Sequence, residues 1–189
     1  RDKKVNESKN HKWNDQPFSD LYQAEIDENG SLSNVSVFSK SLNSKYHESS
    51  GVITKDGTTM YFTRNNTKKG KKVINSKKAT LLKLYKATFD GKKWGNIEEL
   101  PFNSDEYSVA HPALSSDEKI LYFASDMPGS FGFSDLYKVS IDSNGKFGTP
   151  ENLGPTINTE GRETFPFVDA DNNLFFASDG HPGLGGLDI

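Results

Sequence analysis

Short stretches of alternating apolar and polar residues recur along the chain, and turn residues separate them. In the best-defined region, the pattern predicts four strands at 108–114, 120–125, 135–142 and 146–153. Alternation of the kind seen in LYKVSID (136–142) is typical of a half-buried strand. DENG (27–30), DGK (90–92) and DSNG (142–145) predict hairpin turns in which Gly supplies a positive φ. No stretch with a 3.6-residue period is long enough to predict a helix.

The same strand pattern is repeated. LYFASD (121–126) returns 53 residues later as LFFASD (174–179), and MYFTRN (60–65) is a weaker copy. A second marker reads DLY at 20–22 and 135–137, KLY at 83–85 and LDI at 187–189, and a third reads LNSKYHE (42–48), FNSDEYS (102–108) and INTEGRE (157–163). A four-stranded antiparallel unit that repeats about every 53 residues predicts a blade of a β-propeller. The predicted fold class is therefore all-β, a partial β-propeller.

The repeat also predicts how the chain is divided. Residues 1–189 are expected to be a fragment of one β-propeller domain, with a half blade at 1–41, a blade with a lysine-rich insertion at 42–101, a blade at 102–156 and a partial blade at 157–189. Propellers close with about four to eight blades, so we expect a larger ring or a completing partner. Aromatic residues at matched positions are expected to fill the space between blades: Tyr61, Trp94, Tyr122, Phe147 and Phe175.

Composition narrows the function classes. A net charge of −3 and a pI near 5.8 give no support to a nucleic-acid partner. Because the chain has no cysteine, disulfides and thiolate metal sites are excluded. No apolar window approaches 18 residues, so the chain is not expected to span a membrane. The first residues, RDKKVNESKN, lack the apolar middle of a secretion signal, so we expect a cytosolic protein or a chain that begins after its targeting segment.

Few residues stand out as candidates for chemistry. Asp135 and Asp188 follow Gly-rich turns, where a carboxylate is expected to accept backbone N–H bonds and fix the turn, and Lys83 holds the matching place in the unit with the insertion. Candidate channel-lining residues are Glu48, His111 and Glu163. Nucleophile-elbow, H-E-x-x-H and phosphate-loop motifs are absent from the sequence. We therefore expect no catalytic residue, no metal site and no cofactor.

The insertion is rich in lysine. A cluster this dense is expected either to meet an acidic partner or a lipid headgroup surface, or to form a solvated, mobile loop. Its members are Lys68, Lys69, Lys71, Lys72, Lys77 and Lys78.

The repeat resembles a known type. HPALSSDEKILYFASDMPGSFGFSDLY (111–137) and FPFVDADNNLFFASDGHPGLGGLDI (165–189) resemble the TolB-type propeller repeat. With NLGPTINTEGRE (152–163) leading into the next unit, the chain is similar to propellers of Bacteroidota OmpA-family cell-envelope proteins, the PorE-like group associated with type IX secretion. The resemblance implies a periplasmic, outer-membrane-associated protein whose partners are other cell-envelope proteins. Peptidoglycan would be bound only through a domain outside this chain.

Two functions follow from these observations. The leading expectation is a non-enzymatic interaction scaffold of the bacterial envelope. The alternative is a propeller-type hydrolase, either a glycosidase that uses Glu48 and Glu163 or the propeller domain of a serine peptidase with its catalytic domain elsewhere. A nucleophile elbow in a following segment would identify the peptidase.

Overall fold

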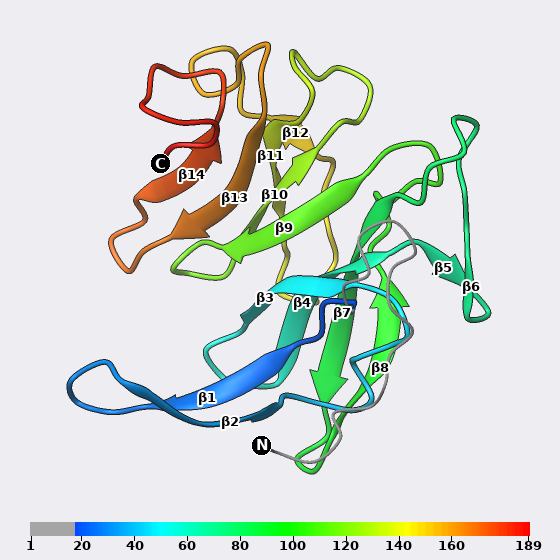
Figure 1. Cartoon of the computed structure of the whole chain (residues 1–189), viewed down its shortest axis with the longest axis vertical. Helices are drawn as coiled ribbons and strands as arrows, with labels where there is room; N and C mark the ends of the chain where they lie inside the picture. Colours follow the sequence, from blue (N-terminus) through cyan, green and yellow to red (C-terminus); the bar gives the residue numbers. More distant parts are fainter. Residues whose placement is uncertain (1–17) are drawn as a thin grey trace.

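The computed structural model describes residues 18–189, and every element in that range is a strand (Figure 1). The strands are β1 (Tyr22–Ile26), β2 (Leu32–Val37), β3 (Glu48–Ile53), β4 (Thr59–Asn65), β5 (Thr67–Lys68), β6 (Lys71–Lys72), β7 (Leu82–Phe89), β8 (Trp94–Glu99), β9 (Val109–Leu114), β10 (Ile120–Ser125), β11 (Asp135–Ser140), β12 (Glu151–Asn152), β13 (Glu163–Val168) and β14 (Leu174–Ser178). The described part of the chain contains no helix that could cross a membrane.

The strands form small antiparallel sheets in chain order. The first sheet has the order β3-β4-β7-β8, and the second has the order β9-β10-β11-β12. The amino-terminal hairpin (β1-β2) precedes them, and the carboxy-terminal hairpin (β13-β14) follows. Figure 1 shows the amino-terminal hairpin beside the first sheet and the carboxy-terminal hairpin beside the second. The predicted all-β fold of four-stranded antiparallel units is confirmed, and residues 18–189 do not form a closed ring.

The structure has two buried apolar clusters, and alternate side chains of β4 contribute to each of them. Phe62 belongs to the cluster between the first sheet and the amino-terminal hairpin, together with Leu42, Tyr85 and Trp94. Its neighbour Tyr61 faces the other way and joins the cluster between the two four-stranded sheets, which contains Phe123. Because successive side chains of a strand point to opposite faces, the first sheet has two apolar faces and packs against a neighbour on both sides.

The second sheet departs from the prediction at its fourth strand. Residues 146–153 were predicted to pair along their length, but β12 spans only Glu151–Asn152, and Phe147 forms an isolated bridge with Ile141. Pro150 lies between these two pairings and has no N–H to donate to the ladder. The outer edge of this sheet is therefore short.

The aromatic residues at matched positions lie in two different environments. The rings of Tyr61 and Phe147 meet at 6.0 Å between the two sheets, and Trp94 lies 5.8 Å from Phe38 of the amino-terminal segment. Tyr122 is half-buried, whereas Phe175 on β14 is 45% exposed. The expectation that these rings pack between sheets therefore does not hold for Phe175 within the described residues, because no further sheet covers β14.

One asparagine in each third marker joins consecutive units. Asn43, Asn103 and Asn158 each accept a bond from the backbone N–H of a leucine at or just before the start of the third strand of the preceding unit and donate to the same leucine's carbonyl. The leucines are Leu21, Leu84 and Leu136. We call this contact the asparagine clamp, and it explains why the Asn keeps a fixed spacing from the strands around it.

The strand that begins each unit carries a bulge at one matched place. Ser50 on β3, His111 on β9 and Phe165 on β13 have φ values of 38°, 57° and 49°. The strand register shifts at these points in all three units. A bulge turns a side chain away from the regular alternation of the strand. These three residues are therefore aimed differently from their neighbours.

Candidate functional site

A cavity of about 350 Å³ lies where the second sheet meets the carboxy-terminal hairpin. Residues from β9, β13 and the loop between β10 and β11 line it, and Leu82 of the first sheet also contributes. The residues that give it chemical character are His111, Asp126, Phe133, Arg162, Thr164 and Phe165. We call this hollow the inner-strand cavity.

The Gly-rich loop before β11 forms one wall of the inner-strand cavity. The N–H of Phe133 donates to the carbonyl of Gly161 at 2.8 Å, and the N–H of Glu163 donates to the carbonyl of Ser134 at 2.8 Å. Gly132 passes so close to the next unit that a Cβ there would lie 2.3 Å from the oxygen of Gly161. Only a glycine fits this approach, so the loop is held against the segment that leads into β13.

The carboxylate of Asp135 holds the same loop by accepting backbone hydrogen bonds from it. This fully buried carboxylate accepts bonds from the N–H groups of Phe131 and Gly132, at 2.8 and 3.0 Å, and from Asn152 Nδ2 at 2.7 Å. At the matching place after the next Gly-rich turn, Asp188 Oδ2 accepts a bond from the N–H of Gly185 at 2.8 Å. Both carboxylates therefore hold turns in the way that the sequence pattern predicts for such positions.

His111 forms the floor of the inner-strand cavity. Its N–H donates to Thr63 Oγ1 of the first sheet, and its Nδ1 lies 2.6 Å from Thr164 Oγ1 of β13. The imidazole stacks on Phe165 with ring centres 4.0 Å apart. Burial lowers the pKa of His111 to about 4 from its usual 6.5, so the ring is neutral at pH 7. His111 therefore joins three units, through its backbone N–H to the first sheet and through its imidazole to β13.

Charged groups lie at the mouth of the cavity. The Arg162 guanidinium stacks over the Phe133 ring at 5.1 Å and pairs with Asp179 at 2.9 Å. On the other side, Asp126 Oδ1 accepts a bond from the N–H of Ser108 at 2.6 Å. The cavity therefore combines aromatic walls with one cation and one anion, which suits a ligand that has both an aromatic ring and polar groups.

The three candidate channel-lining residues have different environments. Glu48 is buried, pairs with Arg64 at 2.7 Å and accepts a bond from the N–H of Ser44. Burial raises the pKa of Glu48, although its hydrogen bonds and Arg64 act in the opposite direction. Glu163 is fully buried and accepts bonds from Thr159 and Ser178, both within its own unit. His111, by contrast, lines the inner-strand cavity.

The lysine-rich insertion lies away from this cavity. Its first four lysines belong to the short hairpin β5-β6, which projects beside the first sheet in Figure 1. The ammonium group of Lys72 lies over the rings of Phe18 and Tyr46, at 5.3 Å from each. Ser76 Oγ donates to Glu106 of the next unit at 2.7 Å. The insertion therefore has both backbone pairing and contacts with neighbouring segments.

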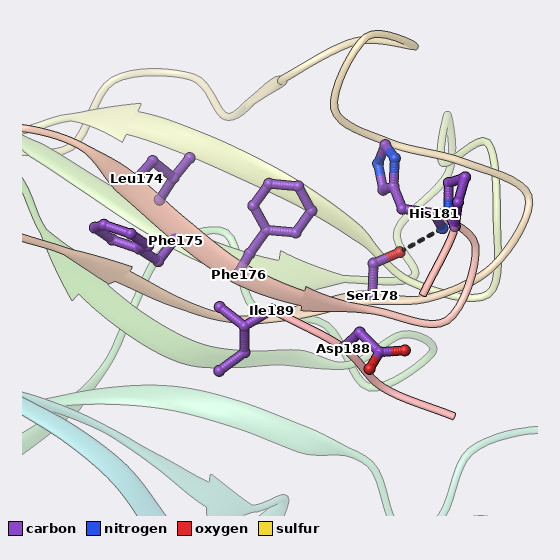
Figure 2. A pocket seen from close by; sticks show the side chains of 8 residues that line it. Leu174, Phe175, Phe176, Ser178, His181, Asp188 and Ile189 are labelled. Atoms are coloured by element: carbon purple, nitrogen blue, oxygen red, sulfur yellow. Dashed lines mark hydrogen bonds between the residues drawn. The ribbon is translucent and has the colours of Figure 1, made fainter. Parts of the chain in front are cut away.

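A second hollow, of about 250 Å³, contains Ser178, His181 and Asp188 (Figure 2). These three residue types make up a hydrolase triad, but their contacts differ from those of one. Ser178 Oγ donates to Glu163 and accepts a bond from the backbone N–H of His181, while His181 Nε2 lies 2.8 Å from the carbonyl oxygen of Ile157. The imidazole has no contact with the serine hydroxyl that would let it act as a base. This hollow therefore has the composition of a triad without its geometry.

No group of three or more potential metal-ligating side chains comes together among residues 18–189.

Most residues of the inner-strand cavity were not predicted from the sequence. Of its six characteristic residues, only His111 was singled out. Arg162, however, occupies a fixed place in the repeat: the N–H groups of His47, Ser108 and Arg162 each donate to the polar residue at the end of the second strand of their unit. Comparing the side chains at that place, His, Ser and Arg, would have identified Arg162 as a candidate.

Comparison with known proteins gives a fold and no close relative. No family model and no curated protein matches the chain. The chain is similar to a serine-to-alanine mutant of puromycin hydrolase complexed with PGG, with 19% identity and a TM-score of 0.53, over 85% of this chain and 24% of that chain. A second puromycin hydrolase structure gives 19% identity and a TM-score of 0.52, with the same coverage. A Mycobacterium tuberculosis puromycin-hydrolyzing peptidase gives 17% identity and a TM-score of 0.47, over 70% of this chain and 20% of that chain.

These comparisons support the β-propeller as the fold and correct the leading functional expectation. The chain spans about a quarter of the length of the puromycin hydrolase that it matches. The expectation of an envelope scaffold is wrong, because the similar structures are hydrolases and agree better with the alternative given above, the propeller domain of a serine peptidase. The physical reason is that the repeat motifs encode how blades pack, and the same packing serves unrelated functions.

Proposed function

We propose that this chain is part of the β-propeller domain of a serine peptidase similar to puromycin hydrolase, with the nucleophile in another domain of the same polypeptide. The observation that carries the proposal is the similarity to puromycin hydrolase over 85% of this chain. The contacts of Ser178 and His181 agree with a nucleophile in another domain, since the His181 imidazole does not contact the Ser178 hydroxyl and so cannot activate it. In this proposal, the sheets shape the space that the substrate enters, and the chain by itself performs no hydrolysis.

The proposal includes further blades that close the ring. In the first sheet, Val52, Tyr61 and Leu84 pack against the second sheet. The matching residues of the last unit are Phe167, Phe175 and Ile189, which are 61%, 45% and 96% exposed. Apolar surface of this extent is stabilised by burial, at about 25 cal/mol per Å². A following blade of the same repeat would cover this face as the second sheet covers the first.

The decisive experiment uses the longer polypeptide that contains this chain. We expect a fluorophosphonate probe to label one serine outside residues 18–189, and the purified protein to release the amino acid from puromycin. Changing the labelled serine to alanine should abolish both results, whereas Ser178→Ala should leave the labelling intact. Absence of both labelling and hydrolysis, or labelling of Ser178 itself, would contradict the proposal.

The resemblance to TolB-type repeats and the periplasmic, outer-membrane-associated location stay predictions. Fractionation of the source cells, with detection of the protein by antibody, tests the location directly. Recovery with the cytosolic fraction would contradict it.

A further inference from the structure

We propose that the inner-strand cavity is a binding site for an aromatic aminoacyl group, that is, an aromatic side chain together with the polar backbone groups of the residue that bears it. The site is argued from the cavity itself and does not depend on the whole protein being a peptidase. The observations that support it are two exposed rings, an imidazole edge without a protein partner and two opposite charges at the mouth.

The walls of the cavity offer an aromatic surface. Phe133 is 70% exposed and Phe165 is 52% exposed, although both border a hollow of about 350 Å³. Phe165 is held in place because its ring stacks on His111 at 4.0 Å. Burying a Phe side chain contributes about 1.5–3 kcal/mol, and aromatic pairs add to this. A flat ring that enters between these walls would gain this stabilisation without a large rearrangement.

The floor of the cavity offers one hydrogen-bonding atom. The Nδ1 of His111 is engaged by Thr164 Oγ1 at 2.6 Å, which fixes the orientation of the ring. The other nitrogen, Nε2, has no hydrogen-bond partner among the described residues. A neutral imidazole can donate or accept at this atom, depending on its tautomer. The ring therefore presents a free polar edge to whatever fills the cavity.

The mouth of the cavity offers groups of both charges. Arg162 uses one of its five N–H bonds for Asp179 Oδ2, and its guanidinium carbon lies 5.1 Å from the centre of the Phe133 ring. Its remaining N–H bonds suit a carbonyl or carboxylate oxygen. Asp126 uses one oxygen for the N–H of Ser108, which leaves the second oxygen for an amine or amide N–H. An aminoacyl group carries a carbonyl and a nitrogen beside its side chain, so its polarity matches this pair.

The volume of the inner-strand cavity indicates the size of the ligand, and its aromatic walls favour a ligand with an aromatic side chain. A volume of about 350 Å³ lies at the lower end of the range of small-molecule sites. It suits one large side chain with its backbone groups rather than a long peptide. An aliphatic side chain would fill less of the space and would not stack on Phe165.

The test measures binding by calorimetry on the longer polypeptide, after its reactive serine has been blocked with fluorophosphonate. The probes are N-acetyl-L-phenylalanine amide and N-acetyl-L-alanine amide. We expect the phenylalanine amide to bind at least about tenfold more tightly, as the burial of one ring predicts. Because the measurement needs no turnover, a protein without hydrolytic activity can still bind the probe, and the two proposals fail separately.

Variants locate the site. Phe133→Ser should weaken binding of the phenylalanine amide about tenfold, and Arg162→Gln several-fold, because each removes one contact with the ligand. Phe131→Ser is the matched control: Phe131 lies in the same loop and is 52% exposed, but it does not line the cavity. Since Phe133 is exposed, its replacement should leave the near-UV circular dichroism unchanged. No saturable binding, or equal losses in the Phe131 and Phe133 variants, would overturn the proposal.

Discussion

The two four-stranded sheets share one strand plan but stabilise it with opposite charges. At the start of the third strand, the first sheet has Lys83 and the second has Asp135, and both side chains are buried. Lys83 pairs with Glu99 at 2.9 Å and with Asp105 at 2.7 Å. Asp135 instead accepts two backbone N–H bonds and the amide of Asn152. A buried polar side chain at this position therefore needs hydrogen-bond or ion-pair partners, and the sign of its charge depends on which partners the local loop supplies.

The partners differ because the loops differ. In the second sheet, the Gly-rich loop turns its backbone N–H groups toward Asp135, which serves as an acceptor. In the first sheet, the insertion replaces that loop, and Asp105 of the next unit bonds both Lys83 and Asn66 Nδ2. Burial opposes the charge of Lys83, but Asp105 and Glu99 outweigh it and raise the pKa of its ammonium group. The comparison teaches that this position keeps a buried polar side chain with hydrogen-bond partners in both sheets, whereas the type and charge of that side chain differ.

The strongest way to break the second sheet is Asp135→Ala. The change leaves two backbone N–H groups and one amide without their buried acceptor, so we expect the free energy of unfolding to fall by about 3–5 kcal/mol. Urea unfolding followed by fluorescence measures it. Asp171→Ala, at an exposed turn position, is the control and should change the stability by about 0.5 kcal/mol at most. A loss of less than about 1 kcal/mol for Asp135→Ala would show that the loop does not need this carboxylate.

The next largest effect is expected for Gly132→Ala. The added methyl group would lie 2.3 Å from the Gly161 oxygen and 2.5 Å from the Thr159 oxygen, so the loop must move at a cost of about 2–3 kcal/mol. The first sheet supplies the control: a Cβ at Gly95 on β8 meets nothing within 4 Å. Gly95→Ala should therefore be neutral or slightly stabilising, and thermal unfolding of both variants measures the difference. Equal melting temperatures for the two variants would contradict this account of the loop.

The asparagine clamp predicts a graded series. Asn158→Ala removes the two bonds to Leu136 and a third to Asn152 Oδ1, so we expect a loss of about 2–3 kcal/mol. Asn103→Ala removes only the two bonds to Leu84 and should cost about 1–2 kcal/mol. Denaturant unfolding of both variants measures the difference. If Asn103→Ala proved the more damaging, the number of hydrogen bonds lost would not be the controlling factor.

The smallest expected effect is a pH dependence that comes from His111. Its pKa is about 4 in the folded chain, against 6.5 when unperturbed, so the unfolded state binds the additional proton between these values. Stability should therefore be fully present above pH 6.5 and decrease as the pH falls toward 4. Because the ring is half-buried, we expect about 1 kcal/mol between pH 7 and pH 5. His111→Gln should flatten this part of the stability profile, and an unchanged slope would contradict the assignment.

The sequence predicted the repeat with good precision and the site with little. The markers LYFASD and LFFASD correspond to β10 and β14, because strand patterning and Gly-rich turns are local properties of the chain. The fourth strand of the second sheet was overestimated, since Pro150 has no N–H to donate and interrupts the pairing of this stretch. Of the cavity residues only His111 was anticipated, because Phe133 and Arg162 become neighbours only when one unit packs on the next.

By itself, the sequence determined the repeat, most of its strands and the turns between them, because these depend on alternation, turn residues and spacing along the chain. The tertiary structure decided which apolar face is covered, which partner satisfies each buried charge and where a cavity forms. These depend on contacts between residues about one repeat apart, such as His111 with Thr164, which no local pattern encodes. The packing of one unit on the next therefore gives units with similar backbones but different buried side chains, hydrogen-bond partners and cavities.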